Sequence, residues 1–141
     1  MPLVFSTSEY ETKSLACKIG KGLVPPQVFA LVGELGSGKT VFAQGLAEGV
    51  GVTEPVTSPT FVIWNRYAGG RGILFDHVDL YRLAGGSSIQ DLGWFEWLDP
   101  KSIMVIEWAD RLDPLPEGAH VVRFSHGFQK TRSIELPREF L

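Results

Sequence analysis

Residues 33–40 read Gly33-Glu34-Leu35-Gly36-Ser37-Gly38-Lys39-Thr40, which matches the pattern G-x-x-x-x-G-K-[ST] of a phosphate-binding loop. The glycines let successive backbone N–H groups turn inward around phosphate oxygens. Lys39 supplies a positive charge for the β- and γ-phosphates, and the Thr40 hydroxyl suits a Mg²⁺ ion. A helix that begins here points the positive end of its dipole at the anion. The segment therefore predicts a nucleoside triphosphate site.

The residues on either side have the pattern that such a loop requires. Residues 28–32 form a short apolar run typical of a strand buried on both faces. Beyond the loop, apolar residues recur at every fourth position from Phe42 to Val50, which predicts a helix with one apolar face. We expect Gly49 and Gly51 to end that helix. Strand, glycine-rich loop and helix thus follow in the expected order.

The composition is ordinary for a soluble globular protein. The 141 residues are 44% hydrophobic and 21% charged, which predicts a single domain over residues 1–141 with one substantial core. We see neither an apolar run of membrane length nor a charged leader, and Cys17 is the only cysteine, so we expect a cytoplasmic protein that does not enter a membrane. The net charge of −3 argues against coating nucleic acid by electrostatics alone.

The remaining patterns predict alternating helices and strands. Ser8 followed by Glu11 indicates a capping box at the start of a helix that runs to about Gly22, and residues 87–98 predict a further helix after the loop helix. The strands expected at residues 60–67 and 73–79 should pair antiparallel, and those at 120–124 and 132–136 should form a hairpin. Strands are expected at residues 3–5, 28–32, 60–67, 73–79, 102–107, 120–124 and 132–136. We therefore predict an α/β, P-loop NTPase-like domain with a mixed parallel and antiparallel sheet flanked by helices.

Two of the expected strands end in carboxylates. In this kind of fold, catalytic residues lie at the carboxyl ends of the strands beside the loop. Glu107 follows an apolar run, where an acid is costly to bury without a cation, so we interpret it as a metal ligand rather than a solvated strand end. Asp79 shares a strand face with His77. Either side chain of this pair could orient water, although a structural role fits His77 equally well.

Three further residues are candidates for nucleotide contacts. Thr60 follows Ser58-Pro59 and resembles a switch residue that senses the γ-phosphate, although it could simply begin a strand. Arg82 lies near the acidic strand end and is a candidate phosphate contact. Trp108 follows Glu107 directly and is expected close to the metal.

Taken in order, these elements resemble the bacterial tRNA threonylcarbamoyladenosine biosynthesis ATPase family, TsaE, also called YjeE. The resemblance extends over roughly residues 5–136 and is more specific than the loop alone. Ser37 stands where alanine is usual, and Val41 replaces a frequent second threonine, which removes a hydroxyl that could contact the α-phosphate. The matching segments are residues 33–40, Ser58-Pro59-Thr60-Phe61, His77-Val78-Asp79-Leu80-Tyr81-Arg82-Leu83, Leu92-Gly93 with Glu96, Ile106-Glu107-Trp108, and Leu115-Pro116.

The resemblance implies a small, slow, Mg²⁺-dependent ATPase. It would assist a heterodimer of TsaB- and TsaD-like proteins that modifies adenosine 37 of tRNA, and would reset that complex between turnovers without performing the transfer. Contact with tRNA is expected to be indirect or local. The implied catalytic residues are Asp79, Glu107 and Thr60, the metal ligands are Thr40 and Glu107, and the nucleotide-binding residues are Gly33, Glu34, Leu35, Gly36, Ser37, Gly38, Lys39, Thr40, Val41, Arg82 and Trp108.

Other functions use the same loop. A small-molecule kinase would add an arginine-bearing lid, and residues 68–72 are short for one. A GTPase would carry an Asn-Lys-x-Asp element, whereas the only asparagine, Asn65, is followed by Arg66. A nucleotide-dependent interaction module with incidental turnover would share the ATPase residues and stays open as an alternative.

Overall fold

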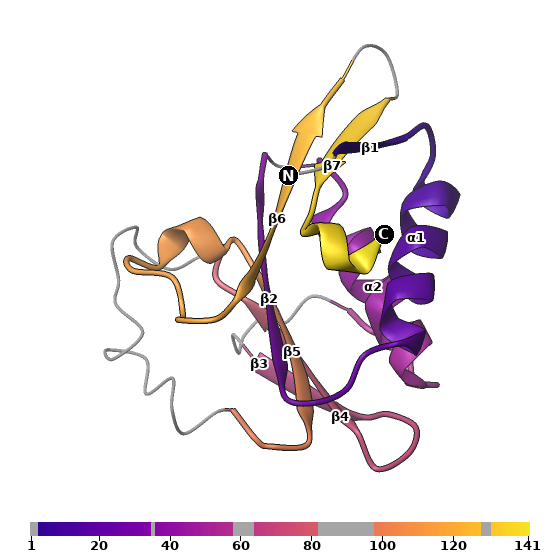
Figure 1. Ribbon diagram of the computed structural model, residues 1–141, viewed down its shortest axis with the longest axis vertical. Helices are drawn as coiled ribbons and strands as arrows, with labels where there is room; N and C mark the ends of the chain where they lie inside the picture. The colour runs from indigo at the N-terminus through magenta and orange to yellow at the C-terminus, as the bar shows by residue number, and fades with distance from the viewer. Residues whose placement is uncertain (1–2, 35, 58–63, 82–97, 128–130) are drawn as a thin grey trace.

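The computed structural model describes residues 3–34, 36–57, 64–81, 98–127 and 131–141 (Figure 1). Within these described residues, two helices, α1 (Glu9–Lys21) and α2 (Lys39–Val50), accompany seven strands in one sheet. Short 3-10 helices, η1 (Ala109–Arg111) and η2 (Arg138–Phe140), follow the fifth and seventh strands. The strands are β1 (Leu3–Ser6), β2 (Gln27–Gly33), β3 (Trp64–Ala68), β4 (Leu74–Asp79), β5 (Ser102–Glu107), β6 (His120–His126) and β7 (Arg132–Glu135).

The sheet mixes parallel and antiparallel pairs, as predicted. Its order is β1-β7-β6-β2-β5-β4-β3, so that β2, which leads into the phosphate-binding loop, lies at the centre. Strand β2 runs parallel to β5 and β6, and β4 runs parallel to β5. The expected antiparallel pairing of β3 with β4 and the expected hairpin of β6 with β7 are both present. The arrangement confirms an α/β, P-loop NTPase-like fold.

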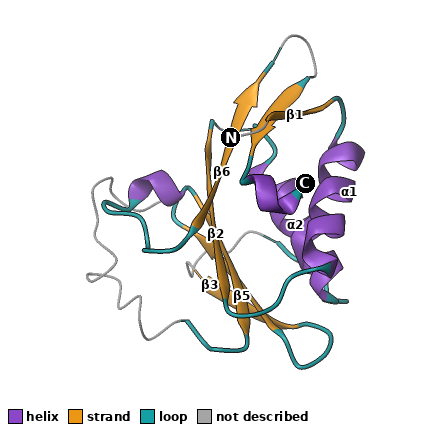
Figure 2. Cartoon of the chain, in the orientation of Figure 1, coloured by secondary structure: helices purple, strands orange, loops and turns teal. Residues whose placement is uncertain are grey.

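Each face of the sheet is covered by its own apolar cluster. Helices α1 and α2 lie together on one side of the sheet, and η1 lies on the other (Figures 1 and 2). Strand β5 supplies Ile103 and Val105 to the cluster on the helical side, and Met104 and Ile106 to the opposite cluster. All six residues of β5 are buried. This two-sided burial explains why the central strands read as continuous apolar runs rather than alternating ones.

Helix α1 begins close to the predicted capping box. The Ser8 hydroxyl accepts a hydrogen bond from the Glu11 N–H at 3.1 Å, and the helix ends with Gly22 as its C-cap. The Glu11 carboxylate accepts from the N–H of Thr7 at 2.9 Å, one residue before the cap. That bond, followed by the one from the Thr7 hydroxyl, lowers the pKa of Glu11.

The prediction that Gly49 helps to end the loop helix is wrong. Gly49 lies inside α2, and only Gly51, with a left-handed φ of 101°, caps it. A Cβ on Gly49 would lie 2.2 Å from the carbonyl oxygen of Cys17 on α1. Gly49 is therefore required for the close approach of the two helices, not for helix termination.

Some predicted elements fall on residues that the structure does not describe. Residues 60–63 of the strand expected at 60–67, and nearly all of the helix expected at 87–98, lie outside the described residues. Sequence patterns did not predict η1 or η2, since a single 3-10 turn has no apolar periodicity of its own. Among the described residues, no helix combines the length and the apolar composition needed to cross a membrane.

Candidate functional site

The phosphate-binding loop joins the carboxyl end of β2 to the amino end of α2. Its backbone needs glycine, because Gly36 and Gly38 have φ values of 73° and 106° in the left-handed region. Gly38 is also the N-cap of α2, so the unpaired N–H groups of the first helical turn face the loop. These features place a helix end that is suited to an anion at the edge of the sheet.

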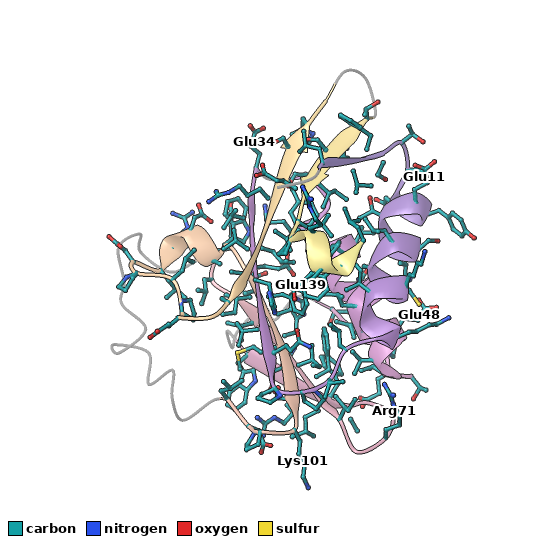
Figure 3. The ribbon with its side chains drawn as sticks, in the orientation of Figure 1. Glu11, Glu34, Glu48, Arg71, Lys101 and Glu139 are labelled. Carbon is teal, nitrogen blue, oxygen red and sulfur yellow. The ribbon has the colours of Figure 1, made fainter. Side chains whose placement is uncertain are left out.

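The carboxyl ends of three adjacent strands meet at this edge. In the parallel register, Glu107 of β5 lies beside both Leu31 of β2 and Asp79 of β4. Figure 3 shows Glu34, the second residue of the loop, at the end of the molecule opposite Arg71 and Lys101. The predicted catalytic carboxylates and the phosphate-binding loop thus share one end of the sheet.

Lys39 folds back over its own loop. Its Nζ donates to the carbonyl oxygens of Gly33 at 2.6 Å and Glu34 at 2.8 Å, and lies 3.8 Å from the centre of the Trp108 ring. Burial lowers the pKa of Lys39, while the negative charges of Glu107 and of nearby carboxylates oppose that shift. A buried ammonium held by neutral carbonyls and an aromatic face is ready to exchange them for anionic oxygens.

Thr40 and Glu107 are joined directly. The Thr40 hydroxyl donates to Oε1 of Glu107 at 2.6 Å, and Oε2 of the same carboxylate lies 2.5 Å from Nε2 of His77. Glu107 is 2% exposed, so the interpretation of a solvated strand end is excluded. A buried carboxylate next to a hydroxyl at the start of a phosphate-loop helix offers the hard oxygen ligands that Mg²⁺ prefers.

Asp79 lies beside Glu107 at the end of β4 and is only partly buried. Burial raises its pKa, and the charge of Glu107 adds to that shift. The Tyr81 N–H, which donates to Oδ1 at 2.9 Å, and the charges of His77 and Lys39 act in the opposite direction. A carboxylate with a raised pKa is a better proton acceptor than an ordinary aspartate.

Trp108 has a backbone conformation that side chains rarely adopt. Its φ of 58° and ψ of 39° lie in the left-handed region, where a residue other than glycine is strained. Its ring contacts Lys39, and its centre lies 5.1 Å from that of Tyr81. The strained turn brings the indole next to the loop lysine.

Some of these residues line a cavity of about 610 Å³, whereas Asp79 and His77 are not among the described residues of its wall. Its walls include Lys39, Thr40, Val41, Glu107 and Trp108 from the predicted set. The other wall could not be predicted from the sequence, because the turn before α1 and strand β7 are distant from the loop along the chain. The capping box at Ser8, which marks a helix end, is the one signal that pointed there. This wall consists of Thr7, Ser8, Glu9, Thr12 and Arg132.

Three predicted site residues cannot be placed. Leu35, Thr60 and Arg82 lie outside the described residues. Ser37, at the position where the resemblance leads us to expect alanine, is 1% exposed. The described part of the site therefore joins the loop, the Thr40–Glu107 pair and Asp79 in one place.

The chain is similar throughout to proteins of one family. The family model described as threonylcarbamoyl adenosine biosynthesis protein TsaE matches residues 6–134. The tRNA threonylcarbamoyladenosine biosynthesis protein TsaE of Nostoc sp. is 34% identical over 139 residues, which is 96% of this chain and 85% of that protein. The protein of the same name from Treponema pallidum is 40% identical over 113 residues, 79% of this chain and 82% of its own length. The crystal structure of YdiB from Bacillus subtilis has a TM-score of 0.74 at 28% identity, over 96% of this chain and 83% of that one.

Proposed function

This chain belongs to the TsaE family of threonylcarbamoyl adenosine biosynthesis proteins, and from that premise we propose that it is a Mg²⁺-dependent ATPase that supports this tRNA modification. Its ATP cycle would reset a complex of TsaB- and TsaD-like proteins after each modification of adenosine 37. We expect it to work in the cytoplasm and to meet tRNA indirectly or through a local patch. This proposal combines the family role with the chemistry of the described residues.

The observation that carries the ATPase proposal is the hydrogen bond of 2.6 Å between Thr40 and Glu107 inside the loop cavity. A hydroxyl and a carboxylate so close together are suited to Mg²⁺, which binds one or two protein oxygens and completes its shell with phosphate and water. Lys39 and the N–H groups at the start of α2 would hold the phosphates. The bound metal would neutralise the negative charge that develops on the phosphates during transfer.

Asp79 and Glu107 would divide the remaining work. Glu107, which is buried and tied to Thr40, would hold the metal. Asp79 lies beside it with a raised pKa and an oxygen free of the Tyr81 bond, so it would orient the attacking water and accept its proton. Thr60 and Arg82 remain proposed as the γ-phosphate switch and a phosphate contact.

Release of inorganic phosphate tests the proposal and its rivals together. We expect slow Mg²⁺-dependent hydrolysis of ATP in preference to GTP by the purified protein, accelerated by TsaB- and TsaD-like partners with tRNA. Many nucleotide switches complete their site with a partner, which is the reason for the acceleration. Stoichiometric phosphorylation of a metabolite with little phosphate release would instead identify a kinase. If the protein binds ATP but releases no phosphate, either alone or with its partners and tRNA, it would be identified as an interaction module.

A further inference from the structure

His77 occupies an unusual place for an imidazole. It lies within β4, is 0% exposed, and stands beside Val105 in the register of β4 with β5. The same face of these strands otherwise contributes Phe75, Ile103 and Val105 to the apolar cluster beneath the helices. An apolar residue would satisfy the packing there, so the polar ring needs another explanation.

The hydrogen bonds of His77 provide that explanation. Nε2 lies 2.5 Å from Oε2 of Glu107, whereas Nδ1 is buried without a hydrogen-bond partner among the described residues. An ionised carboxylate can only accept, so the proton of this bond belongs to Nε2.

Each oxygen of the Glu107 carboxylate therefore accepts a hydrogen bond from a different side chain. Thr40 donates to Oε1 and His77 donates to Oε2, so rotation of the carboxylate is blocked at both ends. Only Oε1 lies at the hydroxyl that suits the metal. We propose that His77 is a positioning residue, which fixes Glu107 so that Oε1 and the Thr40 hydroxyl form a preorganised Mg²⁺ site.

This inference rests on the proposed function, since it assigns His77 to the metal ligand of that site. It also narrows the interpretation of the His77/Asp79 pair, since the sequence alone allows either side chain to orient water. A water-orienting role does not fit His77, because its ring is fully enclosed and its Nε2 is already bonded to Glu107. Partners that orient metal ligands typically change metal affinity by about 10- to 100-fold when they are removed.

Binding of Mn²⁺ in the presence of a non-hydrolysable ATP analogue tests the proposal. Free Mn²⁺ is measured by electron paramagnetic resonance, and analogue affinity is measured separately in EDTA. We expect His77→Leu to weaken Mn²⁺ binding by about 10- to 100-fold with analogue affinity in EDTA preserved. His77→Gln, whose amide can reach Glu107 as a donor, should restore most of the loss. Circular dichroism confirms that each variant is folded.

A double-mutant cycle separates positioning from a structural role. In a Glu107→Gln background, His77→Leu should change Mn²⁺ affinity by less than about twofold, because the residue through which it acts is already altered. Equal Mn²⁺ affinity of wild type and folded His77→Leu would overturn the inference while leaving the proposed function intact. An equal loss in both backgrounds would also overturn it. Failure of the wild type to bind the analogue or Mn²⁺ would overturn the proposed function and this inference together.

Discussion

At the residue scale, Lys39 is the side chain on which the proposed nucleotide binding would depend. Lys39→Ala should weaken ATP binding by about 100-fold or more, because a buried cation is lost from the phosphate site. The fold should remain stable, since a lowered pKa means that the native protein disfavours the charge on this lysine. Isothermal titration with ATP and Mg²⁺ measures the effect, and Lys101→Ala, exposed at the opposite end of the molecule, is the control (Figure 3). Near-normal ATP affinity in a folded Lys39→Ala variant would refute the assigned site.

The raised pKa of Asp79 predicts a pH dependence of stability. The native state holds the proton of Asp79 more tightly than the unfolded state does. Asp79 therefore lowers the stability of the fold as the pH rises from the ordinary pKa of an aspartate, near 3.8, through the raised pKa of the native state. Asp79→Asn should therefore melt at a higher temperature than wild type at pH 7, with the difference disappearing below about pH 3.8. Melting curves across this range check the sign, with exposed Asp113→Asn as the control.

The same substitution separates stability from catalysis. If Asp79 accepts the proton of the attacking water, Asp79→Asn should lower kcat for ATP hydrolysis by about 100-fold, although the protein becomes more stable. Nucleotide affinity should change far less. A variant that is more stable and equally active would leave Asp79 without a catalytic role.

The site residues that could be predicted from the sequence are those that a local pattern along the chain marks. Lys39 and Thr40 belong to the loop motif itself, and Glu107 is recognisable as an acid after an apolar run. The contact of His77 with Glu107 could not be predicted, because it depends on the register of β4 against β5. Arg132 reaches the cavity only because β7 and β6 return beside β2. Periodicity describes a face of a strand, and it contains no information about which strand lies next to it.

At the scale of elements, the α1–α2 contact positions the loop helix. Gly49→Ala should destabilise the protein by about 3 kcal/mol, because its Cβ would lie 2.2 Å from the backbone oxygen of Cys17 and the helices would have to separate. Urea unfolding gives the change in the free energy of unfolding. Gly22→Ala is the matched control, since φ there is −97° and the nearest atom is 3.8 Å away. A loss as small as that of Gly22→Ala would show that the helices can part without cost.

Gly49 also shows why one element boundary was mistaken. Glycine ends helices when it adopts a left-handed φ, as Gly51 does, but it is also used where two backbones approach closely. The sequence does not distinguish these uses, because the neighbouring helix is distant along the chain. The types of the other predicted helices and strands that fall within the described residues were predictable, since buried parallel strands and the Phe42-to-Val50 spacing have strong patterns.

At the scale of the whole molecule, segments at the ends of β2, β4 and β5 and in η1 bring carboxylates around one lysine. Glu34, Asp79, Glu107 and Asp110 all act on the charge of Lys39. This concentration of negative charge disfavours ATP without its metal, so ATP affinity should fall by about 10- to 100-fold when Mg²⁺ is replaced by EDTA. Fluorescence titration with a labelled ATP analogue measures it, and Glu107→Gln should reduce the difference. Equal affinity in Mg²⁺ and EDTA would contradict the metal site.

Under the proposed function, ATP hydrolysis at this site resets a partner complex. The most direct test counts modified tRNA molecules formed per TsaB–TsaD-type complex, with ATP, a threonylcarbamoyl donor and excess tRNA. We predict about one modification per complex without this protein or with Lys39→Ala, and many with the wild type. The reason is that resetting of the complex after each modification requires the intact phosphate site. Equal numbers of turnovers with wild type and folded Lys39→Ala would contradict the account.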